Sequence, residues 1–127
     1  MSAVLLSTDL LGMSKIVGAA QRAGCTLATA ASAADVLARI AAAPAGLVVI
    51  DLSTTRADLA AFVGEVRALP GPPAAVLAFG PHVHEERLQS ARDAGCDAVL
   101  SRGQFHTTAD AIFAQYADSG PADATVR

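Results

Sequence analysis

Two aspartates stand directly after short apolar runs, where carboxylates can do chemistry. Asp9 closes the run LLSTD, and Asp51 closes the run LVVID. If both meet at one edge of a fold, they repel each other, so the pair needs a cation, solvent or a raised pKa. Their oxygen atoms suit Mg²⁺, completed by a backbone carbonyl and waters. An Asp in this position also serves as a turn former or helix cap, and Asp9 is well placed to cap the following helix.

The three histidines are the other candidates for a metal site. His82 and His84 lie in the segment PHVHEE, and His106 lies in the expected loop after the last apolar run. Imidazoles near carboxylates can bind a transition metal. His82 and His84 diverge by about 200° around a helix axis, so they reach one ion only from a loop. The simpler alternative is that they face solvent in a helix's first turn, and His106 is also suited to sensing phosphate or pH.

Short apolar runs predict the strands that must position these residues. Four clear runs and one weaker run, the second, span residues 3–6, 26–29, 47–50, 75–79 and 98–100. The clear runs do not alternate with polar residues. Continuous apolar runs of this length are typical of strands that are covered on both faces, as in a parallel sheet.

Helical segments alternate with these runs. The first is expected from Gly12 to Ala23, and Pro81 is expected in the first turn of the fourth. Capping boxes are expected to open the second, third and fifth, at Ser32–Asp35, Thr55–Asp58 and Thr107–Asp110.

The alternation predicts an α/β fold. It is a flavodoxin-like (βα)5 domain with a doubly wound, five-stranded parallel sheet of strand order 2-1-3-4-5. We expect one domain over residues 1–117 and a flexible C-terminal tail over residues 118–127. Ligands bind such sheets at the carboxyl ends of the strands, where the winding reverses between strands one and three. Asp9 and Asp51 fall at this edge.

Composition excludes several classes of protein. Of the 127 residues, 53% are hydrophobic and 17% are charged, which excludes a disordered chain. Aromatic residues make up 4% and the net charge is −3, so we expect no nucleic-acid binding. Cys25 and Cys96 lack metal-ligand spacing and suit a reducing compartment. The first apolar run has no basic segment before it, and no run has the length of a membrane span. We therefore expect a cytoplasmic protein without membrane contact.

From Ala3 to Tyr116 the chain resembles response-regulator receiver domains, the CheY-like family. In that family two acids after the first strand bind Mg²⁺, and an Asp after the third accepts a phosphoryl group from a histidine kinase. The resemblance implies that Asp51 is the phosphoacceptor and that Asp9 is the direct metal ligand. It also implies that Ser53 offers its backbone carbonyl to Mg²⁺. The implied partners are a histidine kinase or phosphotransfer protein and a downstream protein target.

Several positions depart from the family pattern, so the chain resembles a degenerate member. Thr8 stands where the first acid belongs, and losing that carboxylate weakens the cation site on which phosphoryl transfer relies. Arg102 replaces the Lys that ends the fifth strand, and its planar guanidinium is not equivalent to an ammonium. The remaining departures are Gly103 in place of Pro, Val99 in place of an aromatic residue, and Ala78, Phe79 or Gly80 in place of a hydroxyl residue.

Three functions remain open. The first is a stand-alone receiver in a phosphorelay, with no enzymatic activity beyond phosphorylation and dephosphorylation of Asp51. The second is a pseudo-receiver, an interaction module that is not phosphorylated. The third is a small-ligand or metal-binding flavodoxin-like domain that uses His82, His84 and Asp51.

We expect no output domain after residue 117, so a signal would leave through protein contact. The resemblance to receiver domains implies that a homodimer, one form of such contact, would form through the last two helices and the fifth strand. The residues expected on that surface, some of them also suited to the core, are Leu88, Ala91, Arg102, Phe105, Phe113 and Tyr116.

Overall fold

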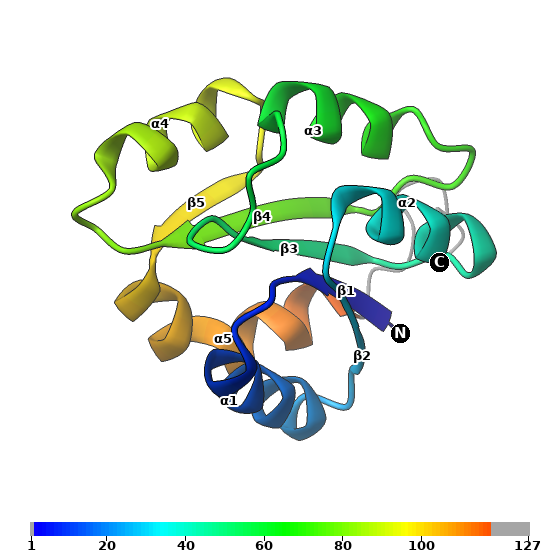
Figure 1. The fold of residues 1–127 in the computed structure, drawn as a ribbon. Coiled ribbons are helices and arrows are strands. Elements are labelled where there is room, and N and C mark those ends of the chain that lie inside the picture. Colours follow the sequence, from blue (N-terminus) through cyan, green and yellow to red (C-terminus); the bar gives the residue numbers. More distant parts are fainter. Residues whose placement is uncertain (1, 118–127) are drawn as a thin grey trace.

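A parallel sheet forms the centre of the molecule (Figure 1). The computed structural model describes residues 2–117, and the predicted tail at 118–127 lies outside them. The strands are β1 (Ser2–Leu6), β2 (Thr26–Ala30), β3 (Leu47–Asp51), β4 (Ala75–Gly80) and β5 (Ala98–Ser101). All neighbouring strands pair in parallel, in the order β2-β1-β3-β4-β5. The predicted doubly wound α/β fold is therefore confirmed.

Helices cover both faces of this sheet. On one face lie α1 (Leu10–Arg22) and α5 (Arg102–Ala117). On the other lie α2 (Ala33–Ala42), α3 (Leu59–Arg67) and α4 (Glu85–Asp93). Two hydrophobic clusters fill the spaces between helices and sheet.

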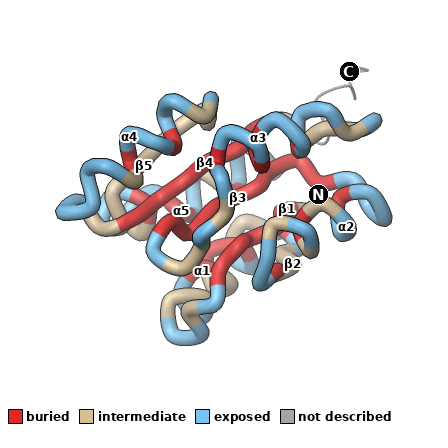
Figure 2. The backbone as a smooth tube through the Cα atoms, turned by 45° about the horizontal axis from the view of Figure 1, so that its top comes forward, coloured by how far each residue is buried: buried red, intermediate tan, exposed pale blue. Residues whose placement is uncertain are grey.

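The two-sided cover explains the unbroken apolar runs. Side chains alternate between the faces of a strand. Val48 and Ile50 of β3 therefore pack towards α2, α3 and α4, whereas Leu47 and Val49 pack towards α1 and α5. Every residue of β3 is buried, and Figure 2 shows the central strands as the buried interior. No helix in the described part of the chain has the length and apolarity needed to cross a membrane.

Four helices begin elsewhere than the sequence predicted, the first being α1, which starts at Leu10 and not at Gly12. Asp58, rather than Thr55, is the N-cap of α3, and its carboxylate accepts a hydrogen bond from the Ala61 N–H at 3.2 Å. The Thr55 carbonyl instead accepts a hydrogen bond from Arg87 at 3.1 Å. Pro81 lies outside α4, in a turn that its carbonyl closes with the His84 N–H at 2.9 Å.

The start of α5 is the largest correction. This helix begins at Arg102, directly after β5, and not at Thr107. The Ser101 hydroxyl accepts a hydrogen bond from the Gln104 N–H at 3.1 Å, and the Gln104 side chain accepts one from the Ser101 N–H at 2.9 Å. This reciprocal pair is a capping box with the spacing S-x-x-Q. Sequence analysis overlooked it in favour of the one at Thr107.

The surface predicted for a homodimer is mostly interior. Leu88, Ala91, Phe105 and Phe113 are at most 5% exposed and belong to the two hydrophobic clusters. Their apolar side chains face the sheet because the helices that carry them bury their apolar stripes there. Only Arg102 and Tyr116 of the six predicted residues are partly exposed, so this prediction was wrong for most of the surface.

Candidate functional site

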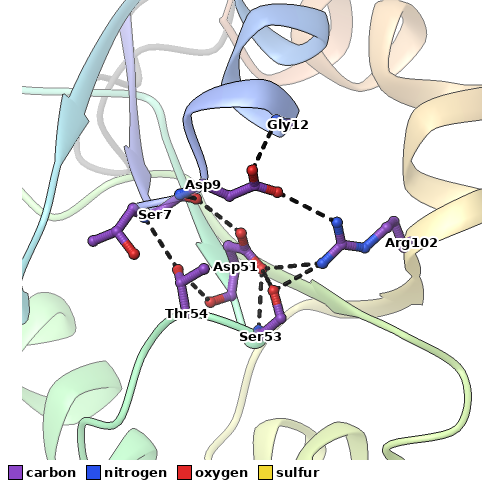
Figure 3. Close-up of polar contacts among 8 residues, drawn as sticks. Ser7, Asp9, Gly12, Asp51, Ser53, Thr54 and Arg102 are labelled. Carbon is purple, nitrogen blue, oxygen red and sulfur yellow. Dashed lines mark hydrogen bonds and ion pairs between the residues drawn. The ribbon is translucent and has the colours of Figure 1, made fainter.

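Asp51 lies at the carboxyl end of β3 and is enclosed by hydrogen bonds (Figure 3). It is only 2% exposed. Its Oδ2 atom accepts a hydrogen bond from the Ser7 hydroxyl at 2.8 Å. Its Oδ1 atom accepts two from Ser53, from the N–H at 3.1 Å and from the hydroxyl at 2.7 Å. Both carboxylate oxygens therefore have protein donors, as a buried charge requires.

Ser7 is a site residue that sequence analysis missed. The pairing of Leu6 with Ile50 in β1 and β3 brings the next residues, Ser7 and Asp51, side by side. Ser7 is also 2% exposed, and its hydroxyl oxygen accepts a hydrogen bond from the Asp9 N–H at 3.1 Å. The available signal was a hydroxyl residue one register step beyond the β1 run, opposite the Asp51 position.

Asp9 has two roles in this structure. It is the N-cap of α1, where its Oδ1 atom accepts a hydrogen bond from the Gly12 N–H at 3.1 Å. Its Oδ2 atom lies 3.5 Å from Nη1 of Arg102. The Gly12 hydrogen bond and the nearby Arg102 charge hold the pKa of the Asp9 carboxyl below its usual value. A side chain at position 12 would lie 2.6 Å from Asp9 Oδ2, so Gly12 leaves room for this arrangement.

Arg102 places its guanidinium between the two carboxylates (Figure 3). Its Nη2 atom donates a hydrogen bond to the Ser53 hydroxyl oxygen at 2.8 Å and lies 3.9 Å from Oδ1 of Asp51. Its Nη1 atom faces Asp9. Arg102 is the first residue of α5, so the Ser101–Gln104 capping box fixes the backbone that carries it. Asp9 and Asp51 thus lie near each other, at the edge of the sheet where the sequence placed them, and Arg102 contacts both.

The donor atoms present do not fit Mg²⁺ in this arrangement. Mg²⁺ takes an octahedral shell of oxygen atoms at about 2.1 Å. Each Asp51 oxygen already accepts a hydrogen bond, and a guanidinium carries the positive charge between Asp51 and Asp9. Thr8, at the position of the missing acid, is exposed, and its N–H donates a hydrogen bond to Thr54 Oγ1 at 3.2 Å. The predicted role of the Ser53 carbonyl in Mg²⁺ binding remains a prediction.

The histidine metal site that the sequence left open as an alternative is not formed in the described part of the chain. Among residues 2–117, no group of three or more His, Cys, Asp or Glu side chains could hold a metal ion. His82 and His84 are exposed and lie in the turn before α4, so the simpler interpretation of them as solvent-facing polar residues is the better one.

The sequence predicted His106 in a loop, but this residue lies within α5. Its ring meets the edges of Phe79 and Phe105, with centroids 6.1 and 5.8 Å apart. Partial burial, together with the positive charges of Lys15 and Arg102, lowers the pKa of His106. These surroundings therefore favour the neutral imidazole over the protonated one.

The end of β4 offers no hydroxyl to the site. Strand pairing places Phe79 opposite Asp51 and leaves Gly80 as the last strand residue. Ala78 pairs with Ile50, one step below the site, so it is not the residue that faces Asp51 along the strand. Phe79 stacks on Phe105, with ring centroids 4.4 Å apart and planes within 4°. An aromatic pair thus lies beside Asp51.

Comparison with known proteins identifies the fold but no sequence family. No family model and no curated protein matches the chain. A response regulator from Hahella chejuensis superposes with a TM-score of 0.74 at 18% identity, covering 91% of this chain and 93% of that one. The chain has the fold of response-regulator receiver domains.

Two further receiver structures support this assignment. The receiver domain of NtrX from Brucella abortus gives a TM-score of 0.73 at 19% identity, covering 92% of this chain and 98% of that one. The receiver domain of the sensor histidine kinase PA1611 from Pseudomonas aeruginosa gives 0.75 at 12% identity, covering 92% and 97%. The PA1611 receiver has a magnesium ion coordinated in its active-site cleft. At these identities the likeness establishes the receiver fold alone.

Proposed function

We propose that this chain is a pseudo-receiver, a signalling module that works through protein contact without phosphorylation of Asp51. The carrying observation is the enclosure of Asp51, whose two oxygen atoms accept hydrogen bonds from Ser7 and Ser53 while Arg102 lies alongside. A phosphoryl donor must reach one of these oxygens. With the carboxylate 2% exposed, no oxygen is free to attack before a hydrogen bond breaks.

Arg102 supports the same proposal through charge. Phosphoryl transfer depends on a cation that bridges donor and acceptor oxygens and neutralises developing charge. In this chain a covalently attached guanidinium lies between Asp9 and Asp51, and its planar fork is already used on Ser53 and Asp9. A guanidinium stays charged at all ordinary pH values, so it offsets part of the negative charge of the two carboxylates without a metal ion.

Exposed apolar side chains at the same edge of the sheet favour protein contact. Leu10 and Leu11 at the start of α1 are 80% and 86% exposed, and Val83 in the β4–α4 connection is 71% exposed. A homodimer, or a different protein target, would cover such side chains. We also propose that the chain has no enzymatic activity and that it is cytoplasmic.

Incubation with acetyl phosphate and Mg²⁺ tests the proposal. We expect the intact mass of the wild-type protein to stay unchanged, as in the Asp51→Asn variant. A receiver domain that accepts phosphate from the same donor serves as the positive control. A gain of one phosphoryl group in the wild type that Asp51→Asn abolishes would overturn the proposal.

A phosphorylated receiver is the second candidate, and one observation favours it. Asp9 and Asp51 both keep their carboxylates near a single cationic group, at 3.5 and 3.9 Å from the Arg102 nitrogens. A histidine kinase or phosphotransfer protein that displaced Arg102 would expose both acids to Mg²⁺. Under this alternative, binding of a protein target depends strongly on Asp51→Asn and on Mg²⁺, whereas the pseudo-receiver is indifferent to both.

A further inference from the structure

A recess lies beside the Asp51 site, between the segment after β3 and the start of α4. Its volume is about 420 Å³, within the range of about 300–1,000 Å³ that is typical of small-molecule sites. Its lining residues are Leu52, Ser53, Thr55, Arg56, His84 and Arg87. Ser53 and His84 were considered above for other roles, but no role has been given to Arg56 or Arg87.

The lining is cationic and contains no carboxylate, although the chain as a whole is acidic with a net charge of −3. Arg56 is exposed and has no hydrogen bond or ion pair with any of residues 2–117. Arg87 is half-buried, and its Nη2 atom donates a hydrogen bond to the Thr55 carbonyl at 3.1 Å. This bond fixes Arg87 on the pocket wall and leaves most of its five N–H donors for a ligand.

We propose that this pocket binds the phosphate group of a small ligand through Arg56 and Arg87. Guanidinium groups match the oxygens of a phosphate with paired, charge-assisted hydrogen bonds. The Thr55 hydroxyl adds a further donor among the lining residues, whereas the Ser53 hydroxyl already donates to Asp51. The imidazole of His84 is the one aromatic ring in this lining. Little surface is therefore available to stack a nucleobase, and the ligand class is an aliphatic phosphate ester or inorganic phosphate itself.

Ser53 connects this pocket with Asp51. Its hydroxyl donates to Asp51 Oδ1 at 2.7 Å, accepts from Arg102 at 2.8 Å, and also lines the pocket. If the Ser53 hydroxyl donated its hydrogen bond to a phosphate oxygen instead, Asp51 would lose one of its hydrogen bonds. Occupancy of the pocket would thus alter the network at Asp51 without any transfer of a phosphoryl group. Binding here requires no chemistry at Asp51, so this proposal and the pseudo-receiver proposal can fail separately.

Titration calorimetry with glycerol 3-phosphate and with inorganic phosphate, at constant ionic strength, tests the site. We expect saturable binding of at least one of them, weakened about tenfold or more by Arg56→Gln because a charge-assisted pair is lost. Arg56 has no partner within the described fold, so this variant is expected to fold normally. Lys15→Gln is the matched control, because it removes one charge from the recess between α1 and α5 that Lys15 lines. Binding should be unchanged in this control.

The same titrations distinguish the two probes from each other and the pocket from the Asp51 site. Tighter binding of glycerol 3-phosphate identifies an ester ligand, and equal or tighter binding of inorganic phosphate identifies the free anion. Binding that persists in Asp51→Asn supports the pocket. The proposal is overturned by no saturable binding at about 10 mM of either probe. It is equally overturned by affinity unchanged in Arg56→Gln, by an equal loss in Lys15→Gln, or by loss in Asp51→Asn.

Discussion

At the residue scale, the site is one connected polar network of hydrogen bonds and ion pairs. Its members are Ser7, Asp51, Ser53 and Arg102. The sequence indicated the charged members, because acids at strand ends and a basic residue after β5 are recognisable by type and position. The Ser7 hydroxyl gave no such signal, since serine is common at strand ends and its bond to Asp51 arises from the pairing of β1 with β3.

Ser7→Ala should destabilise the fold, because it leaves Oδ2 of buried Asp51 without a donor. We expect the free energy of unfolding to fall by about 1–3 kcal/mol, the cost of an unsatisfied buried polar group. Urea denaturation followed by circular dichroism measures it. Ser14→Ala is the control, since Ser14 is exposed in α1 and has no side-chain hydrogen bond with any of residues 2–117. Equal stability of the two variants would contradict the assigned role of Ser7.

At the element scale, the residue at which each helix begins decides where the side chains of the site lie. Sequence patterns predicted the order of all ten helices and strands, because apolar periodicity extends over each element and averages out local ambiguity. They failed at the starts of α3 and α5, where two competing caps lie within a few residues. The choice between Ser101 and Thr107 depends on how soon the chain must turn back over the sheet, which is a tertiary requirement.

Ser101→Ala and Thr107→Ala together test the start of α5. The Ser101 variant should lose about 0.5–2 kcal/mol of stability, the usual cost of removing an N-cap hydroxyl. Thr107 lies inside the helix, where its hydroxyl donates to the Gly103 carbonyl at 2.9 Å. Its replacement by Ala should change stability by less than about 0.5 kcal/mol. The reverse order of effects in thermal or urea denaturation would place the helix start at Thr107.

The sheet brings residues from distant segments together at the scale of the whole molecule. Asp9, Asp51 and Arg102 meet because β1, β3 and β5 run parallel and end at the same edge. The receiver fold is retained by a chain without a detectable sequence family. Continuous apolar strands and two covering layers of helices therefore specify this fold without a complete receiver motif.

Stability should fall on mild acidification because of His106. Burial lowers its pKa in the folded state below the ordinary value of 6.5, so the unfolded chain binds the proton more readily. Stability is therefore highest above this value and declines as the pH falls through about 6.5 towards the lower folded-state pKa. Lys15 and Arg102 face His106 and oppose its protonation, whereas Asp51 and Asp9 favour it to a smaller extent.

The measurement is the urea midpoint at several pH values for the wild type and His106→Gln. The variant should lose the decline over this range. Asp9 and Asp110, whose pKa values are lowered by their partners, affect stability only in more acidic solution, as the pH falls through the ordinary carboxyl value of 3.8 towards their lower folded-state pKa values. An identical decline in both proteins would exclude His106 as its source.

The sequence by itself determined the sheet, the strand order and the meeting of Asp9 with Asp51. These follow from hydrophobic patterns along the chain and from the handedness of parallel connections. Tertiary structure alone decided that Arg102 lies between the acids, that Ser7 binds Asp51 and that Phe105 and Phe113 are buried. These outcomes depend on the register of neighbouring strands and on where each helix begins, because both set the direction in which a side chain points.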